Sequence, residues 1–334
     1  MRTLAWITAL TLTTALCMGG CNALKDTKFT PSEAEKKLAS FCLKEGNLTV
    51  LTQRVGQTLW IYVPVNEPIF DVKASGERKD PSRKIMPLSL LSLQSEFSQK
   101  YFKFNFDIVP DVLSGEPVSY GSAYNESYTK KRQLIYQGMQ ESFFNAKGTD
   151  KEPIPTFFVI LVTDTTKGVA TKSIIYLRDL RQFMTEAIPP DEYYMRELNE
   201  IIGKEGLIND TKGRNVPYAD ITWTYFLTEQ IKNRIKFKFT SSDFPPETEP
   251  LKEIATLAAN TLRFYPFTDY AGIVLYDVRN KKETTLTQEQ LKTYAAKTNW
   301  EETQGRLTTI HFELPKDPTQ GIFTSIEDKK DVNE

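Results

Sequence analysis

The sequence predicts an α+β protein in which helices pack on small, mainly antiparallel sheets. Helical stripes of apolar residues alternate along the chain with short β-like runs. Many of these runs come in pairs separated by a short polar turn, which is typical of hairpins. The chain has 334 residues, more than one hydrophobic core usually serves, so we expect two or three sub-domains.

An N-terminal α/β unit is expected over residues 31–110. Residues 30–33 (Thr-Pro-Ser-Glu) combine a capping box with proline at the first helical position, so a helix should begin here. Gly46 should end that helix, and a strand pair should follow between residues 48 and 63. A half-buried strand is expected at 101–109 because apolar and polar residues alternate there. Its buried face should carry Phe102, Phe104, Phe106 and Ile108.

A central helix-hairpin-helix unit is expected over residues 111–204. After an irregular stretch, a helix near 130–144 should precede the apolar strand 157–162. That strand is apolar throughout, which suits the centre of a sheet. A second strand should pair with it, and helices should follow at 178–186 and 191–202.

A C-terminal helix-hairpin-helix unit is expected over residues 205–314. It should begin with a helix near 221–234 and a short strand at 235–239, where apolar residues alternate with lysines. Residues 251–294 then predict a helix, a hairpin and a second helix, and 306–314 reads as a last alternating strand.

The order helix, strand, strand, helix occurs at 130–186 and again at 251–294. The helix at 31–45 with its hairpin resembles a shortened third copy. Two interpretations stay open, a repeated helix-strand-strand unit and chance similarity. The polar, acidic tail 315–334 is expected to be disordered.

The N-terminus carries features of a bacterial lipoprotein signal. Residues 4–16 form an apolar run that is too short to span a bilayer but suits a secretory signal. Residues 18–21 (Met-Gly-Gly-Cys) resemble the lipobox of bacterial lipoproteins, with methionine as a mild departure at the apolar position. The resemblance implies that residues 1–20 are removed as a signal peptide and that Cys21 carries fatty-acyl chains such as palmitate. Residues 21–30 would then be a tether.

A lipid-anchored chain would work at the cell envelope. Two or three acyl chains hold a protein stably on a bilayer, whereas a single chain is marginal. Asn22 follows the cysteine, and in enteric-type sorting this favours the outer membrane, facing the periplasm. The alternatives are a plain secretory peptide, or a buried N-terminal helix with Cys21 as an ordinary thiol.

The composition argues against several classes of partner and site. A net charge of −1 gives no basic excess for binding nucleic acid or anionic headgroups. With Cys17 removed and Cys21 acylated, Cys42 would be the only free thiol, so no disulfide is expected. Cys42 lies on the apolar stripe of its helix and should be a buried structural thiol, with a reactive thiol as the alternative.

The sequence offers no clear catalytic or cofactor motif. His311 is the one histidine, and it should face solvent on the strand 306–314. One histidine and one free cysteine supply too few groups for a zinc site or a catalytic triad. The chain also lacks a glycine-rich phosphate loop and a calcium loop. We therefore expect no catalytic residue, no metal and no cofactor.

Two loops each have two interpretations. The charged loop 73–84 could be a solvated excursion or a recruitment site. The irregular stretch 111–129 contains Tyr120, Tyr124 and Tyr128, which could serve recognition or could pack on the core.

The sequence therefore predicts a non-catalytic binding or assembly module on the envelope, with another envelope protein as its partner and an undetermined oligomeric state. One alternative is an envelope hydrolase that uses a non-local carboxylate pair or His311. Another is a solute-binding lipoprotein, which would have two lobes around a deep pocket.

Overall fold

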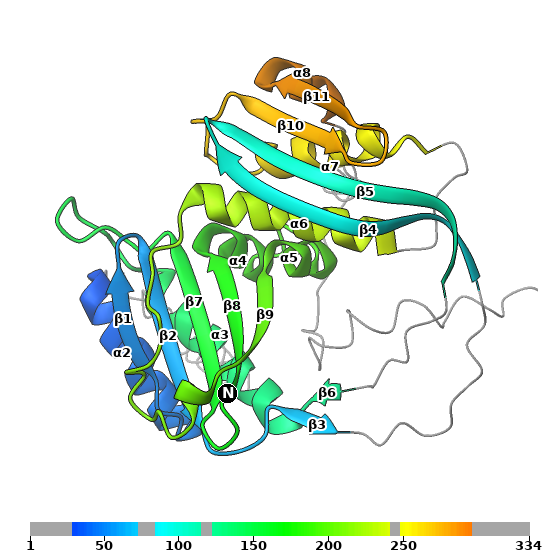
Figure 1. Cartoon of the computed structure of the whole chain (residues 1–334). Helices are drawn as coiled ribbons and strands as arrows, with labels where there is room; N and C mark the ends of the chain where they lie inside the picture. The colour runs from blue at the N-terminus through cyan, green and yellow to red at the C-terminus, as the bar shows by residue number, and fades with distance from the viewer. Residues whose placement is uncertain (1–28, 73–83, 115–121, 241–247, 296–334) are drawn as a thin grey trace, which may run out of the picture.

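The computed structural model describes residues 29–72, 84–114, 122–240 and 248–295. It contains two large sheets, and helix α6 (Trp223–Thr240) lies between them (Figure 1). The predicted α+β class is confirmed. Most strand pairs are antiparallel, but each large sheet also contains one parallel pair.

Sheet 1 has five strands in the order β1-β2-β7-β8-β9. They are β1 (Leu51–Val55), β2 (Thr58–Val65), β7 (Phe157–Asp164), β8 (Val169–Tyr176) and β9 (Leu198–Gly203). β2 and β7 run parallel, and the other pairs are antiparallel. Every residue of β7 is buried, so the prediction of a central strand at 157–162 is confirmed.

Two helices, α2 (Pro31–Gly46) and α3 (Glu126–Phe143), pack on one face of sheet 1. The capping box predicted for α2 is present, because Thr30 and Glu33 bond to each other's backbone amides. Cys42 is fully buried in this layer, as expected, and burial raises the pKa of its thiol to about 11. Leu38, Ile135 and Met139 pack there against Ile61, Phe158 and Ile160 of the sheet.

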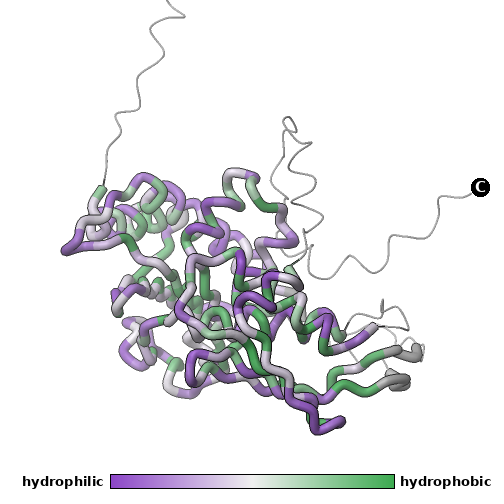
Figure 2. The backbone as a smooth tube through the Cα atoms, turned by 90° about the horizontal axis from the view of Figure 1, so that it is seen from above, coloured by the Kyte–Doolittle hydropathy of each residue, from purple (hydrophilic) through white to green (hydrophobic). Residues whose placement is uncertain are grey.

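Sheet 2 has four strands in the order β11-β10-β5-β4. They are β4 (Lys84–Ser98), β5 (Tyr101–Ser114), β10 (Gly272–Asp277) and β11 (Lys282–Thr287). Phe102, Phe104, Phe106 and Ile108 are buried on one face of β5, as predicted. Helix α6 contacts β4 and β5, and α7 (Pro250–Arg263) packs beside α6. One core cluster therefore joins α6, α7, sheet 2 and the second face of sheet 1. In the hydropathy view of Figure 2, many hydrophilic segments lie at the periphery of the fold.

The remaining elements are short. Strands β3 (Phe70–Val72) and β6 (Ser122–Tyr124) pair with each other, apart from the large sheets. The others are α4 (Leu177–Met184), α5 (Pro190–Arg196), the 3-10 turn η1 (Glu205–Leu207) and α8 (Gln288–Tyr294).

The two large sheets share one strand pattern. A hairpin meets a second hairpin through a parallel contact, with β1-β2 against β7-β8 in sheet 1 and β4-β5 against β10-β11 in sheet 2. A helix precedes each second hairpin, and another helix begins directly after it. The helix-strand-strand unit therefore recurs as α3-β7-β8 and as α7-β10-β11.

The expected units do not correspond to separate sheets, because one unit supplies strands to both large sheets. The N-terminal unit 31–110 supplies β1 and β2 to sheet 1 and the β4-β5 hairpin to sheet 2. Its boundary at residue 110 falls within β5. The expected strand 306–314 and the tail 315–334 lie outside the described residues.

The helix expected at 191–202 is wrong in its second half. Helix α5 ends at Arg196, and 198–203 form β9 at the edge of sheet 1. The backbone at Glu197 is extended, with φ −82° and ψ 126°. Pairing with β8 therefore replaces further helical turns, since the ladder satisfies the backbone groups of this segment.

The short strand expected at 235–239 is also wrong, because α6 continues to Thr240. Ile231, Ile235 and Phe239 are spaced by four residues and are all buried. Phe237, which the strand pattern would place with them, is 63% exposed. The helical spacing prevails because it buries three large side chains on one face.

A buried ion pair joins α3 to the segment between α5 and β9. Arg132 of α3 pairs with Glu197, whose side chain is fully buried. Tyr136 donates a hydrogen bond of 2.8 Å to the same carboxylate. Burial raises the pKa of Tyr136 well above its ordinary value, so the phenol stays protonated and keeps donating.

The preceding residue, Arg196, is the last residue of α5 and takes part in buried ion pairs that connect α5 to α4 and α6. Its guanidinium pairs with Asp179 of α4 at 2.8 Å and with Glu192 of α5 at 2.7 Å. Glu192 also pairs with Arg234 of α6 at 2.8 Å. Tyr265, which follows α7, donates to Asp179 at 3.0 Å. Side chains from α4, α5 and α6 and from the segment after α7 therefore meet around Arg196.

We predict that Glu197→Ala destabilises the protein, because it leaves the buried Arg132 without its carboxylate. Losing one partner of a buried pair lowers the free energy of unfolding by about 3–5 kcal/mol. The control is Glu141→Ala, which removes an exposed pair with Lys37 and should cost less than about 1 kcal/mol. Urea denaturation of both variants measures the difference, and equal losses would contradict the role given to Glu197.

Candidate functional site

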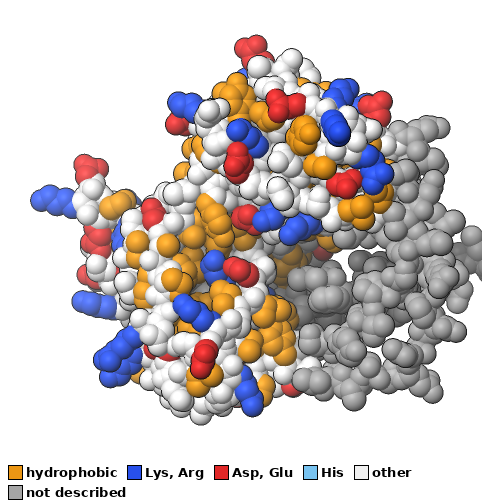
Figure 3. Space-filling view, viewed as in Figure 1, with side chains coloured by type: hydrophobic (Ala, Val, Ile, Leu, Met, Phe, Trp, Pro, Cys, Tyr) orange, Lys and Arg blue, Asp and Glu red, His pale blue; other side chains and the backbone are white. Residues whose placement is uncertain are grey.

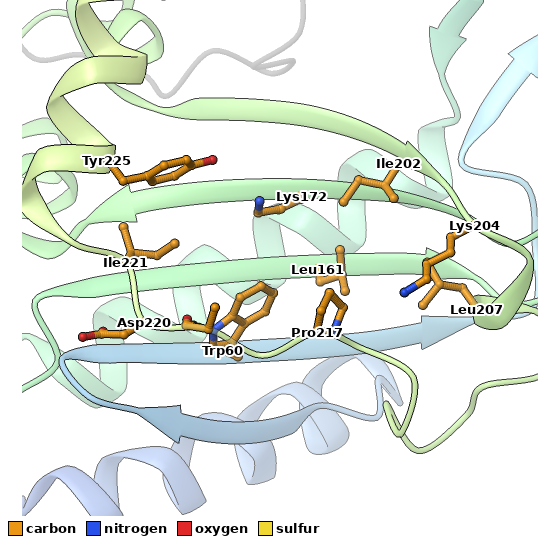
Figure 4. Close-up of a pocket in the computed structure, with 11 residues that line it drawn as sticks. Trp60, Leu161, Lys172, Ile202, Lys204, Leu207, Pro217, Asp220, Ile221 and Tyr225 are labelled. Atoms are coloured by element: carbon orange, nitrogen blue, oxygen red, sulfur yellow. Dashed lines mark hydrogen bonds between the residues drawn. The ribbon is translucent and has the colours of Figure 1, made fainter. Parts of the chain in front are cut away.

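An apolar pocket with a volume of about 270 Å³ lies on the face of sheet 1 opposite α2 and α3. Four strands supply its floor, through Trp60 of β2, Leu161 of β7, Lys172 of β8 and Ile202 of β9 (Figure 4). These side chains share one face because side chains alternate along each strand and the register aligns them. In Figure 3 this face shows apolar side chains with a few charged ones among them.

The segment 205–222, which we call the wall loop, and the first turn of α6 form the sides of the pocket. These two parts and the residue after β9 line the pocket with seven side chains: Lys204, Leu207, Pro217, Ala219, Asp220, Ile221 and Tyr225. Apart from two lysines, an aspartate and a tyrosine hydroxyl, the lining side chains are apolar, as in most small-ligand sites.

Side chains of β2 hold the end of the wall loop in place. The indole Nε1 of Trp60 donates to the carbonyl of Ala219 at 2.8 Å. The hydroxyl of Thr58 donates to the Asp220 carboxylate at 2.7 Å and accepts from the Ile221 amide at 2.7 Å. Asp220 is therefore engaged in fixing the loop.

The middle of the wall loop is ordered by Asp210. Its carboxylate accepts from the amides of Arg214 at 3.0 Å and Asn215 at 2.8 Å. Tyr62 of β2 donates to the Asp210 carbonyl from beneath. Gly213 lies between these contacts with φ +67°, a conformation that favours glycine. The pocket is therefore preformed by bonds between the loop and the sheet.

One of the two lysines that line the pocket has no ion-pair partner in the described part of the chain. Lys172 pairs with Glu200 at 3.3 Å. Lys204 forms no ion pair with any residue that the structure describes, and Figure 4 shows its amino group reaching back over the pocket. The Asp220 carboxylate keeps its charge but is held by neutral donors, the Gln57 amide and the Thr58 hydroxyl, so Lys204 is the charged group with free hydrogen-bond donors for a ligand.

Tyr225 supplies a hydrogen-bond donor at the other end of the pocket. The residue is 42% exposed, and in Figure 4 its hydroxyl points toward Lys172. Burial, and then the carboxylates of Glu229 and Glu200, raise the pKa of Tyr225, so the phenol stays protonated at neutral pH.

The arrangement is suited to holding an apolar group that carries a negative charge. The lining includes no histidine, serine or cysteine that could act as a nucleophile beside a base. Among the described residues, no cluster of three His, Cys, Asp or Glu side chains could hold a metal ion. Within the same residues, no helix has the length and apolar character needed to cross a bilayer.

A second hollow, on the outer face of sheet 2, has a different character. Its lining is mostly polar and includes Tyr101, Lys103, Asn105 and Tyr276. Lys103 already pairs with Glu96 at 3.3 Å. This face resembles an ordinary solvated sheet surface, so the pocket on sheet 1 is the stronger candidate.

The residues that the sequence singled out lie elsewhere. Cys21, Tyr120 and His311, with most of the loop 73–84, lie outside the described residues. Tyr128 is buried and stacks on Tyr124 with ring centroids 4.9 Å apart, as the core-packing interpretation expects.

The pocket could not be predicted from the sequence because its floor comes from four strands that are far apart in the chain. One of these strands, β9, was expected to be a helix. One signal was present in the sequence. Lys172 interrupts the apolar face that Ala170 and Ile174 share on β8. A lysine on a largely buried face indicates a place where that face opens to solvent or to a ligand.

We predict that Gly213→Ala loosens the wall loop. A Cβ at this position would collide with the Tyr218 hydroxyl and would occupy a left-handed conformation. The free energy of unfolding should fall by about 1–3 kcal/mol. Gly206→Ala in the same loop is the control, because the nearest atom to its new Cβ is 3.7 Å away and its φ is not positive. Thermal and urea unfolding measure both variants, and a neutral Gly213→Ala would show that the loop is not rigid.

Comparisons of this chain with protein-family models, with curated proteins and with solved structures find no match. The pocket is therefore interpreted from its own geometry, the apolar lining fixed by the wall loop and the free amino group of Lys204.

Proposed function

We propose that this chain is a lipid-anchored, non-catalytic binding protein of the bacterial cell envelope. Its pocket on sheet 1 would hold an apolar group that carries one negative charge. The observation that carries this proposal is the preformed apolar pocket with Lys204, which has no ion pair among the described residues, at its rim.

The apolar part of the ligand would provide most of the binding free energy. Each buried methylene contributes about 0.8 kcal/mol, so a short chain or an aromatic ring gains several kcal/mol before association costs. An ion pair at an exposed rim adds at most about 1 kcal/mol. Lys204 would therefore orient the ligand and select for an anion, while the apolar lining holds it.

The anchor and the location are proposed from residues 18–21. A diacylated Cys21 would hold the folded part at a bilayer surface, with residues 21–30 as the tether. Asn22 favours the outer membrane, facing the periplasm, as the place of action. The partner at that surface would be another envelope protein.

We predict that octanoate binds the pocket and that Lys204→Met weakens this binding by about threefold to fivefold, the equivalent of one exposed ion pair. Octan-1-ol has the same tail without the charge, so its affinity should not change. Lys212→Met is the control, because Lys212 lies in the wall loop but does not line the pocket. Ile202→Trp should block both ligands by filling the floor of the pocket.

Calorimetry of the wild type and the three variants measures these affinities. Two results would refute the pocket's role. One is no octanoate binding to the wild type, and the other is an equal effect of Lys204→Met and Lys212→Met.

We predict that Cys21→Ala abolishes acylation and moves the protein from the membrane fraction to the soluble fraction. Intact-mass analysis and metabolic labelling with an alkyne fatty acid provide the measurement. Cys42→Ala is the control, because Cys42 is buried in the folded part and should leave labelling unchanged. A wild-type protein without acyl mass would exclude the anchor.

A further inference from the structure

The pocket lies directly beside a strand edge that is unpaired within the described residues. β9 is the last strand of sheet 1, and its neighbour on one side is β8. It supplies Ile202 to the pocket floor, and Lys204 follows directly after it. The outer edge of β9 therefore borders the same site.

The register identifies which backbone groups of β9 face outward. The amide of Lys204 donates to the carbonyl of Gly168 at 2.9 Å, so residue 204 faces β8. Backbone groups alternate along an antiparallel strand, so Ile202 and Glu200 also face β8. Asn199, Ile201 and Gly203 then point their N–H and C=O groups away from the sheet.

This edge is open. Ile201 is 60% exposed, and no atom lies within 4 Å of the position that a Cβ on Gly203 would occupy. Within the described chain, no hydrogen bond reaches the outward backbone groups of Asn199, Ile201 or Gly203. Three residues thus present donors and acceptors to whatever lies beside β9.

Two of the other edge strands, β1 and β11, carry charged side chains, which natural proteins place on exposed strands as a protection. Edge strand β1 carries Arg54, which bonds to the Pro153 carbonyl, and β11 begins with Lys282 and Glu283. β9 has the sequence Leu-Asn-Glu-Ile-Ile-Gly, and its one charged residue, Glu200, is paired with Lys172. β9 therefore lacks the lysines, prolines and bulges that discourage strand addition.

We propose that β9 binds an extended segment of a partner envelope protein as an additional strand of sheet 1. This inference rests on the proposed function, because it identifies the occupant of the same pocket. In an added strand, alternate side chains would lie on the face that carries Ile202. One of them would enter the pocket as the apolar group, and an acidic side chain of the segment would meet Lys204.

A peptide fits these features better than a lipid does. An acyl chain could fill the apolar pocket, but it has no amide groups for Asn199, Ile201 and Gly203. An extended peptide supplies those hydrogen bonds, an apolar side chain and a carboxylate from one continuous segment. The edge and the pocket therefore favour the same occupant.

The test starts from random dodecapeptides displayed on phage and selected on the full chain carrying Cys21→Ala. Synthetic copies of the selected peptides are then titrated by calorimetry against the same protein and its variants. Ile201→Pro removes one outward N–H, whereas Ile201→Ala keeps it and changes only a side chain on the face away from the pocket. A peptide with alternate N-methylated amides keeps its side chains but loses half of its backbone donors.

We expect apolar peptides with an acidic residue to bind and to compete with octanoate. Ile201→Pro and N-methylation should each weaken peptide binding by about tenfold or more, and Ile201→Ala by less than about twofold. Octanoate should bind Ile201→Pro as it binds the wild type, which also shows that this variant folds.

Three outcomes would overturn the strand proposal. They are selection of no peptide, equal binding of peptides to the wild type and to Ile201→Pro, and a dimer of this chain that Ile201→Pro dissociates. Failure of the proposed function looks different, because octanoate would then not bind the wild type even if peptides bound along β9.

Discussion

The structure depends on the buried ion pairs at Arg196 and Glu197, where α5 ends and β9 begins. The side chain of Glu197 pairs with Arg132. The adjacent side chain of Arg196 pairs with Asp179 and Glu192. Charges removed from water stay in a fold only when paired, so both side chains must be held in these positions. This requirement connects α3, α4, α5 and α6 at one point of the chain.

The same constraint creates the candidate site. Because Glu197 is extended and paired, the chain leaves α5 there and runs along β8 as β9. Without β9 the pocket would lose Ile202 from its floor and Lys204 from its rim. A structural interaction thus positions residues that do not themselves take part in it. Polar bonds between β2 and the wall loop complete the pocket from the other side.

The features that could be predicted from the sequence are those that local physics decides. The capping box of α2, the buried thiol of Cys42, the central strand at 157–162 and the aromatic face of β5 all follow from patterns within a few residues. The error at 235–239 comes from a segment where strand-like alternation and helical spacing were both present, and the error at 191–202 from a helix that ends earlier, at Arg196. There, contacts with distant parts of the chain decided the outcome, namely the ladder with β8 and the burial of Phe239.

By itself, the sequence determined the α+β class, the hairpins β1-β2, β7-β8 and β10-β11 and the helices that flank them, because hydrophobic periodicity and capping act over short distances. Tertiary structure alone decided that the β4-β5 hairpin joins β10 rather than β2, and that residues from four strands and the wall loop enclose one pocket. Register and sheet order depend on which surfaces bury each other across the whole chain. No window of sequence contains that information.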